Sequence, residues 1–216
     1  MKQSEIFLET EGNSWHERNW NKPREPDAIV EALMRLEIKP QNILEIGCGS
    51  GLRLKELQRL YKGSTVCGVD PSEEALKDWA PKHKGSHKIQ GTATSLPGSN
   101  GRFDLVIFGF CLYVCDREDL FRIVAESDRV LQDQGYLIVY DFFSEAAHSR
   151  AYAHDDRLRS YKMDHARLWL ANPSYSLLDH QIHAVPPPPS VLPGDEDRVS
   201  VAVLKKDITA GFPLLS

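Results

Sequence analysis

The feature that most constrains the fold of this chain is an apolar segment that runs directly into a glycine-rich turn. The segment spans residues 42–46, and the glycines that follow it are Gly47, Gly49 and Gly51. Glycine lets the backbone turn sharply and lets a ligand approach where a Cβ would block it. A second apolar run over residues 65–69 ends at Asp70. This order of strand, turn, helix and second strand predicts one nucleotide-binding half of a doubly wound parallel sheet.

The spacing of the glycines and one neighbouring acid narrow the class of nucleotide. A dinucleotide-binding turn has the spacing G-x-G-x-x-G, whereas these glycines alternate with single residues. Glu45 precedes the turn, and a fixed carboxylate is a poor neighbour for a pyrophosphate. The pattern suits a ligand with a cationic end and no phosphate, which describes S-adenosylmethionine. A tight turn without a ligand is the structural alternative. Asp70 argues against it, because its carboxylate can accept hydrogen bonds from both hydroxyls of a ribose.

The segment from Glu45 to Gly51 resembles the first motif of the class I S-adenosylmethionine-dependent methyltransferases, which reads like E-x-G-x-G-x-G. The resemblance implies S-adenosylmethionine as the cofactor, with its adenine at Thr92 and Ala93. Thr92 stands where the family carries an acid, so its hydroxyl would accept a weaker hydrogen bond. The methionine part would lie at the end of the fourth strand. The cofactor-binding candidates in this core are Glu45, Gly47, Cys48, Gly49, Gly51, Asp70, Pro71, Thr92, Ala93, Phe108 and Gly109.

Trp15 and Arg18 lie in a polar amino-terminal segment, residues 1–26, that we expect to fold over the pocket as a lid. Arg18 would pair with the cofactor carboxylate and Trp15 would cover the site from water. The W-x-x-R-N spacing resembles an element of small methyltransferases from polysaccharide and nonulosonic-sugar biosynthesis loci. Residues 160–165 and 172–175 resemble a later part of the same group. A packing role for Trp15 and a surface role for Arg18 are the alternatives.

Apolar runs alternate with helical patterns along the rest of the chain. Strands are expected near residues 42–46, 65–69, 88–89, 103–110, 135–141, 175–183 and 198–204. This alternation predicts an α/β fold, a doubly wound, seven-stranded, mostly parallel sheet whose last strand is antiparallel, the layout of class I methyltransferases. We expect one domain over residues 1–216. A polar insert over residues 142–174 would cover the acceptor site, because loops after strand ends carry specificity.

Methyl transfer is an in-line displacement at carbon that needs no metal, so the reaction depends on positioning and, for some acceptors, on a base. The candidate bases lie at strand ends and in the insert: Asp141, Tyr113, His148 and Tyr161. His154 and His165 are weaker candidates of the same kind. Asp141 ends the fifth strand, where ligands bind in such sheets, and capping the following helix is its alternative. Exposed positions in the insert are the alternative for His148 and His154, and covering apolar surface is the alternative for His165.

Composition excludes several classes of function. The 216 residues carry a formal net charge of −5, so no chain-wide basic field exists to attract nucleic acid. No apolar run is long enough to span a bilayer, which predicts a cytoplasmic protein without a membrane partner. The four cysteines match no metal or disulfide spacing, so we expect reduced thiols. The oligomeric state does not follow from the sequence.

These patterns lead to one hypothesis and two alternatives. We expect an enzyme that transfers a methyl group from S-adenosylmethionine to a small polar acceptor, with a sugar derivative as the one suggested by resemblance. A methyltransferase acting on a protein side chain is the first alternative. The second is a catalytically silent binding module that uses the proline run 186–189 as its contact with a partner.

Overall fold

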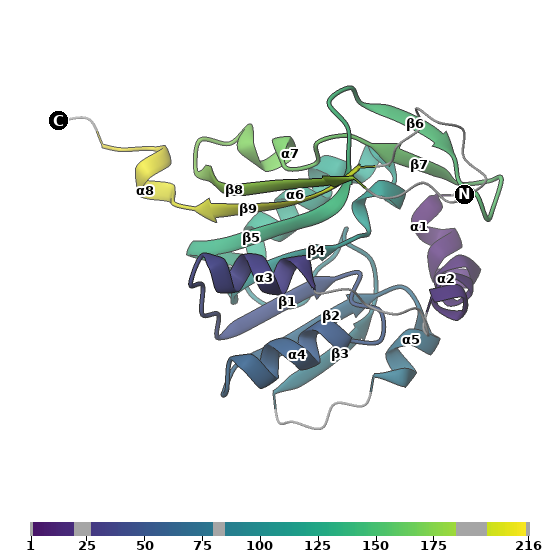
Figure 1. Ribbon diagram of the computed structural model, residues 1–216, viewed down its shortest axis with the longest axis horizontal. Helices are drawn as coiled ribbons and strands as arrows, with labels where there is room; N and C mark the ends of the chain where they lie inside the picture. Colours follow the sequence, from purple (N-terminus) through teal and green to yellow (C-terminus); the bar gives the residue numbers. More distant parts are fainter. Residues whose placement is uncertain (1, 20–26, 80–84, 185–197, 215–216) are drawn as a thin grey trace.

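The computed structural model describes residues 2–19, 27–79, 85–184 and 198–214, and its centre is a seven-stranded sheet (Figure 1). The strand order is β3-β2-β1-β4-β5-β9-β8. The strands are β1 (Asn42–Ile46), β2 (Thr65–Asp70), β3 (Ser86–Gln90), β4 (Phe103–Gly109), β5 (Leu131–Phe143), β8 (Tyr175–Ala184) and β9 (Arg198–Lys206). Strands β1 to β5 pair in parallel, whereas β9 is antiparallel to both β5 and β8. The predicted fold class, including the antiparallel last strand, is confirmed.

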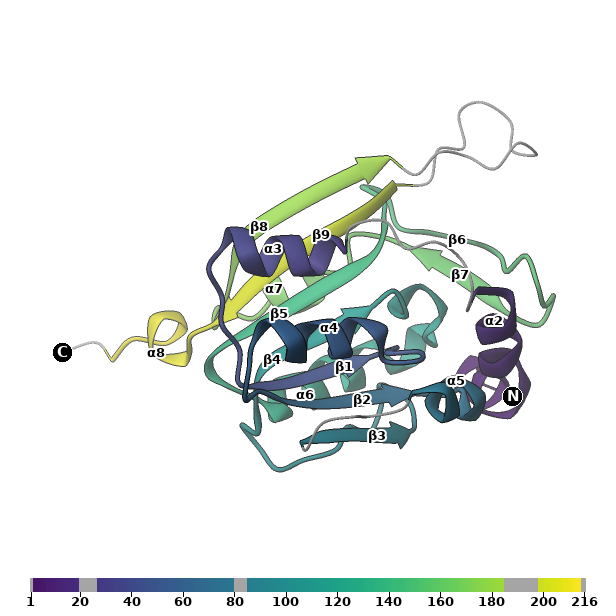
Figure 2. The same cartoon turned by 60° about the horizontal axis from the view of Figure 1, so that its bottom comes forward.

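Helices cover both faces of the sheet, so successive residues of its central strands are buried on opposite sides. On β1, Ile43 packs in the cluster that contains α3 and α4, whereas Leu44 packs in the cluster that contains α6 and α7. Figure 2 shows α3 and α4 along the same side of the sheet. The helices after the amino-terminal segment are α3 (Ala28–Arg35), α4 (Leu52–Leu60), α5 (Glu73–Asp78), α6 (Leu120–Val130), α7 (Arg167–Leu170) and α8 (Ile208–Gly211). Burial on both faces explains why these strands read as continuous apolar runs.

The turn between β1 and α4 has the backbone geometry that its glycines make possible. Gly47, Gly49 and Gly51 all have positive φ angles, of 73°, 53° and 68°. A Cβ on Gly47 would also lie 2.8 Å from the Cβ of Cys111, which follows β4. The turn therefore brings the backbone after β1 directly against the backbone after β4.

The amino-terminal segment is helical, which its polar sequence did not predict. It forms α1 (Gln3–Ile6), the π-helix η1 (Phe7–Glu11) and α2 (Gly12–Asn19). At one end, the Asp116 carboxylate accepts hydrogen bonds from the backbone N–H groups of Gln3 at 2.8 Å and Ser4 at 3.0 Å. At the other end, His16 contacts Asp78 at 2.8 Å. The segment is thus attached on both sides of the sheet's carboxyl edge. Residues 20–26 of the expected lid lie outside the described residues.

The insert after β5 contains a second, two-stranded sheet that the sequence did not predict. Strands β6 (His148–Ala151) and β7 (Arg159–Lys162) pair in antiparallel fashion, with His148 opposite Lys162. The hairpin lies beside α1 (Figure 1), because the Gln3 side chain donates to the Arg159 carbonyl at 3.2 Å. It also contacts the 3₁₀ helix η2 (Leu112–Val114) that follows β4. A second 3₁₀ helix, η3 (Arg117–Asp119), leads into α6.

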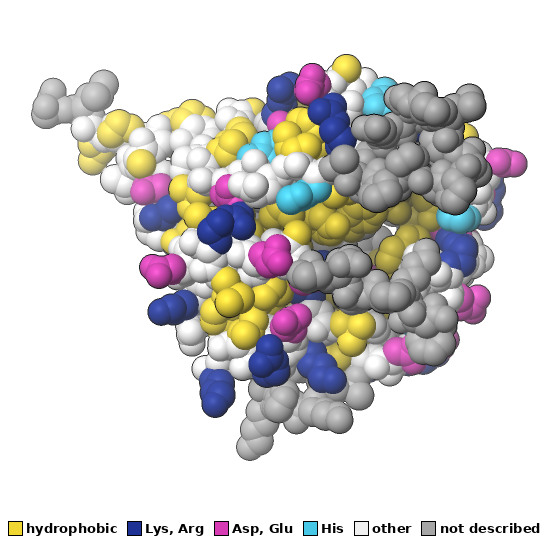
Figure 3. All heavy atoms as spheres, in the orientation of Figure 1, with side chains coloured by type: hydrophobic (Ala, Val, Ile, Leu, Met, Phe, Trp, Pro, Cys, Tyr) yellow, Lys and Arg dark blue, Asp and Glu magenta, His cyan; other side chains and the backbone are white. Residues whose placement is uncertain are grey.

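Two further observations concern the surface and the thiols. On the face seen in Figure 3, basic and acidic side chains are interspersed rather than gathered into one patch. No described helix has the length and apolar character needed to cross a membrane. All four cysteines are free thiols. The proline run 186–189 lies outside the described residues.

Candidate functional site

The carboxyl ends of β1, β2 and β4 open into a cavity of about 750 Å³, counting the part that is open to solvent. We call it the central cavity. Its walls come from four strand ends and the amino-terminal helices: Ile46, Gly47, Val69, Asp70, Pro71, Gly91, Thr92, Ala93, Gly109, Phe110, Cys111, Tyr113, Val114 and Cys115, with Ser4, Phe7, Gly12 and Trp15. The neighbours β1 and β4 flank the point where the strand order reverses, and ligands of open α/β sheets bind at that point.

Asp70 is the only charged side chain among the described residues that line the central cavity. Its carboxylate accepts hydrogen bonds from the backbone N–H groups of Gly49 at 2.7 Å and Ser72 at 2.9 Å, which fix its orientation. Burial raises the pKa of Asp70, and these two N–H groups oppose that shift. The described lining contains no Lys, Arg or His, so a phosphate would meet no counter-charge. The cavity fits a neutral or cationic ligand.

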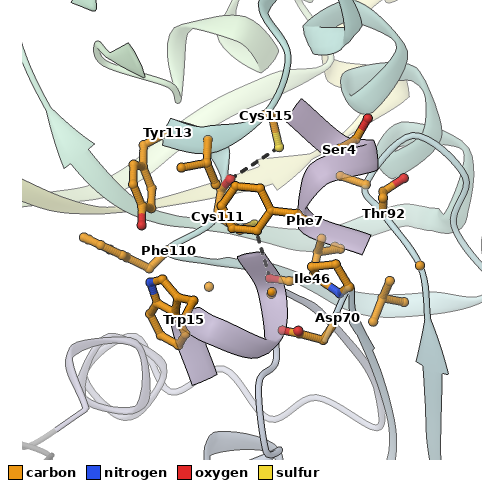
Figure 4. Close-up of a pocket in the computed structure, with 18 residues that line it drawn as sticks. Ser4, Phe7, Trp15, Ile46, Asp70, Thr92, Phe110, Cys111, Tyr113 and Cys115 are labelled. Carbon is orange, nitrogen blue, oxygen red and sulfur yellow. Dashed lines mark hydrogen bonds between the residues drawn. The ribbon is translucent and has the colours of Figure 1, made fainter. Parts of the chain in front are cut away.

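The two sides of the cavity differ in chemistry (Figure 4). Asp70 and Thr92 lie on one side, and the rings of Trp15, Phe110 and Tyr113 lie on the other. The Thr92 hydroxyl is 2.9 Å from that of Thr94. One side can therefore accept and donate hydrogen bonds, whereas the other offers aromatic faces.

Phe110 has a backbone conformation that bulky residues rarely adopt, with a φ of 63°. Its N–H donates to the Tyr140 carbonyl at 2.8 Å, which holds the chain as it leaves β4. The ring centroid lies 5.2 Å from that of Tyr113 and 4.8 Å from that of Phe142. Strained residues cluster at ligand sites, and this one sets the aromatic side of the cavity. No signal in the sequence marked Phe110, Phe7 or Cys115 as lining residues.

Seven of the cofactor-binding candidates line the central cavity, and six do not. Those that line it are Trp15, Gly47, Asp70, Pro71, Thr92, Ala93 and Gly109. Those outside the lining are Arg18, Glu45, Cys48, Gly49, Gly51 and Phe108. Gly49 contributes indirectly, because its N–H holds the Asp70 carboxylate. The assigned roles of all thirteen stay predictions.

Glu45 and Arg18 have protein partners that the sequence did not indicate. Glu45 is 1% exposed and forms an ion pair with Arg53 of α4, whose Nε also donates to Asp27 at 2.7 Å. Arg18 forms an ion pair with Glu11, and Glu11 also accepts a hydrogen bond from the Tyr152 hydroxyl at 2.8 Å. Glu45, whose carboxylate we expected beside the cation of the cofactor, is thus paired with the Arg53 guanidinium outside the lining of the cavity.

The four candidate bases lie in three different places. Tyr113 lines the central cavity, and burial raises its pKa, so the phenol keeps its proton at neutral pH. Asp141 is 1% exposed and accepts from the N–H groups of Leu112 at 2.7 Å and Phe142 at 2.7 Å. It therefore fixes η2 and lies outside the lining. His148 and Tyr161 line a second cavity.

The second cavity lies between η3 and the β6–β7 hairpin, and we call it the hairpin cavity. It measures about 1030 Å³, counting the part that is open to solvent. Its walls are Cys115, Arg117, Leu120, Ala147, His148, Ser149, Arg159, Tyr161, Lys162, Met163 and His165. Cys115 belongs to the walls of both cavities. The two spaces are therefore neighbours across one side chain.

Comparison with known proteins places this site in a recognised domain. A family model described as "Methyltransferase domain" matches residues 44–139, the stretch from β1 to β5 that supplies most of the central cavity. Residues 44–139 therefore resemble a methyltransferase domain. The strand order is that of the class I methyltransferase fold. Among the described residues, no group of three or more His, Cys, Asp or Glu is placed to hold a metal.

Three known proteins illustrate what this chain is similar to. A fatty-acid O-methyltransferase of Mycolicibacterium smegmatis is 29% identical over 107 residues, 49% of this chain and 38% of that protein. A malonyl-[acyl-carrier protein] O-methyltransferase of Legionella pneumophila is 30% identical over 113 residues, 51% of this chain and 39% of that protein. The alignments thus span about two fifths of these relatives' length.

The third similarity is to a solved structure. A Burkholderia thailandensis 1,6-didemethyltoxoflavin-N1-methyltransferase, solved with its acceptor and S-adenosylhomocysteine, superposes with a TM-score of 0.71. The two chains are 20% identical, and the alignment covers 94% of this chain and 88% of the other. At this identity the likeness establishes the fold, and it extends beyond residues 44–139 to nearly the whole chain.

Proposed function

We propose that this chain is an enzyme that transfers a methyl group from S-adenosylmethionine to a small polar acceptor. The observation that carries the proposal is the central cavity: it lies at the strand-order reversal of a methyltransferase domain, with one fixed carboxylate and no lining cation. Adenosine bearing a sulfonium matches that combination, and a phosphate-bearing cofactor does not. The acceptors named for the three relatives differ widely, so their names do not choose one for this chain.

The lining residues divide between the parts of the cofactor they would hold. Asp70 would accept hydrogen bonds from the ribose hydroxyls, and Thr92 and the Ala93 backbone would lie at the adenine edge. The faces of Trp15, Phe110 and Tyr113 would attract the cationic sulfur. Gly47 and Gly109, which both line the central cavity, would lie beside the methionine part.

S-adenosylmethionine, when bound, supplies a methyl group already activated toward displacement. The chain's residues then have to orient the acceptor and exclude water. Phe7 and Trp15 of the amino-terminal helices cover the apolar side of the central cavity, and a dry, apolar site favours a step in which opposite charges disappear. Burial raises the pKa values of Tyr113, Cys111 and Cys115. None of these three groups is a ready base at neutral pH, which favours an acceptor that needs no deprotonation.

The wider predictions from the sequence are kept as part of this proposal. We propose that residues 1–216 act as one methyltransferase domain, with residues 1–26 as its lid and residues 142–174 over the acceptor site. A cytoplasmic location, the lack of a nucleic acid partner and a sugar-derived acceptor stay predictions. The helices that cover the central cavity favour a small acceptor over a protein side chain, because a protein substrate needs an open groove.

Calorimetric titration with S-adenosylhomocysteine tests the proposal. Asp70→Ala should weaken binding about 10- to 150-fold, the loss expected for hydrogen bonds to a charged group. Glu74→Ala, an exposed acid on neighbouring α5 that pairs with Lys77, is the matched control and should bind as the unaltered chain does. Equal affinity of both variants would refute the ribose assignment. Tight binding without methyl transfer to any acceptor would instead favour the silent binding module.

A further inference from the structure

The hairpin cavity concentrates positive charge in a chain whose net charge is −5. Its described walls carry five basic or imidazole side chains: Arg117, His148, Arg159, Lys162 and His165. None of its described lining residues is an acid. The central cavity beside it has the reverse character, one carboxylate and no cation. Such a segregation of charge at adjoining cavities is typical of ligand recognition rather than of a solvated surface.

Two of the basic side chains are buried, so the cavity is more than a group of surface charges. His165 is 3% exposed, and neither ring nitrogen has a hydrogen-bond partner within the described part of the chain. Leaving a buried polar group unpaired is costly, so such groups usually await a ligand or water. Lys162 is 6% exposed, and its ammonium lies 4.2 Å above the centroid of the Phe142 ring.

Carboxylates close to the cavity are held by other partners. Asp116 accepts the N–H groups of Gln3 and Ser4. Asp119 accepts from the Lys2 ammonium at 2.9 Å. On the opposite wall, Asp164 pairs with Arg167 at 3.3 Å. These three acids thus have partners that lie outside the walls of the hairpin cavity.

The hairpin cavity adjoins the place where the methyl group would be transferred. Cys115 lines both cavities. Tyr113 of the central cavity packs edge-on against Phe142, with ring centroids 5.1 Å apart, and Phe142 in turn carries Lys162 on its face. An acceptor held by the basic groups would thus reach the aromatic side of the central cavity across a single residue.

We propose that the hairpin cavity binds a carboxylate or phosphate group of the methyl acceptor, so that the acceptor is an organic anion. This inference rests on the proposed function, since it assigns the substrate class of the same site. Arg117 and Arg159 on opposite walls offer planar donors that match either oxyanion. Lys162 and His165 supply the buried donors at its base. An anion recognised here explains why a chain of negative net charge keeps these side chains together.

The test uses the full chain and two anions with a neutral analogue. Succinate and inorganic phosphate are titrated by NMR or calorimetry, and succinamide serves as the uncharged control. We expect one of the anions to bind and succinamide not to. The double variant Arg117→Gln with Arg159→Gln should weaken anion binding roughly 10- to 100-fold. Which anion binds more tightly distinguishes a carboxylate from a phosphate.

Two controls separate a specific site from general charge and from misfolding. Arg157→Gln removes an exposed arginine of the same hairpin that pairs with Asp155 outside the cavity, and it should leave anion binding unchanged. Lys162→Met keeps the packing on Phe142 and removes the charge, so it repeats the test with a buried residue. Equal anion binding by the double variant and by Arg157→Gln overturns the inference, as does binding of succinamide. If the unaltered chain did not bind S-adenosylhomocysteine, that result would instead overturn the proposed function.

Discussion

The central cavity and the hairpin cavity share Cys115 but are built in different ways. The central cavity is formed by strand ends and glycine turns that follow one another in the family-matched region, and its charge is one buried carboxylate. The hairpin cavity is formed by the insert after β5 and by η3, and its charges are basic. Under the proposed function, the common sheet would hold the methyl donor and the added hairpin would select the acceptor.

The largest expected effect is on stability, and it concerns the buried ion pairs of Arg53 next to the central cavity. Arg53→Met leaves the buried carboxylate of Glu45 and that of Asp27 without their cation, so the free energy of unfolding should fall by about 3–5 kcal/mol. Arg159→Met, in the exposed wall of the hairpin cavity, should change it by less than about 0.5 kcal/mol. Urea denaturation measures both. Similar decreases in the free energy of unfolding for the two variants would show that the charged groups at both cavities contribute equally to stability.

An intermediate effect on stability is expected where α1 contacts Asp116, next to the hairpin cavity. Asp116→Ala removes the acceptor for the first N–H groups of α1, and losing such a cap costs about 0.5–2 kcal/mol. Hydrogen exchange of residues 3–16 should therefore accelerate, while exchange in β1 and β4 should not. Glu118→Ala removes an exposed partner of Lys2 and is the control. Unchanged hydrogen exchange in Asp116→Ala would show that Asp116 does not hold the amino-terminal helices in place.

A smaller effect concerns the pH dependence of stability in the segment that follows Thr92 and Ala93 of the central cavity. Glu126 accepts from the Leu96 N–H at 2.9 Å and pairs with Arg129, and hydrogen bonds from Arg129 lower its pKa from 4.5 to about 2. A lowered folded-state pKa gives stability that is complete above the unfolded value and is lost as the pH falls from about 4.5 toward 2. Glu126→Gln should flatten the decline in stability over that range by up to about 1 kcal/mol. Parallel acid-unfolding curves for both chains would contradict this role.

The smallest effect separates the cavities by salt. Raising the ionic strength from about 0.05 to 0.5 M screens exposed charges, so phosphate or succinate binding at the hairpin cavity should weaken a few-fold. S-adenosylhomocysteine carries no net charge and meets one buried carboxylate, so its affinity should hardly change. Titrations of both ligands in the same buffers provide the measurement. If both ligands showed the same salt dependence, the two cavities would not differ in the electrostatic contribution to binding.

The sequence predicted those parts of the molecule that depend on local patterns. Apolar runs located the central strands, because burial on both faces leaves a continuous signal, whereas the exposed edge strand β3 gave only a weak signal. The glycine turn with Asp70 located the central cavity. The helices over residues 3–19 were missed, because their sequence is polar and tertiary contacts such as Asp116 to Gln3 hold them. The hairpin was missed because His148–Ala151 shows no alternation of apolar and polar residues.

Individual roles were harder to predict where a partner is distant in sequence. Arg53 looks like an ordinary charge on an amphipathic helix, and only the fold brings it to Glu45. Asp141 was expected as a base or as a cap for the following helix. In the structure it holds the N–H groups of η2, which precedes it by about thirty residues. Phe110 has a positive φ at the point where the turns after β1 and β4 lie close together, and the sequence of neither segment reveals this.

The π-helix η1 has a consequence for the register of everything that follows it. A π-turn contains one residue more than an α-helical turn and is seldom kept without a reason. If the five residues Phe7–Glu11 were wound as a regular α-helix, with none deleted, each later side chain would rotate by about 100° around the axis. Trp15 would then point away from the central cavity, although the sequence of the segment had not changed. The π-helical turn therefore determines which side chains of α2 face the central cavity.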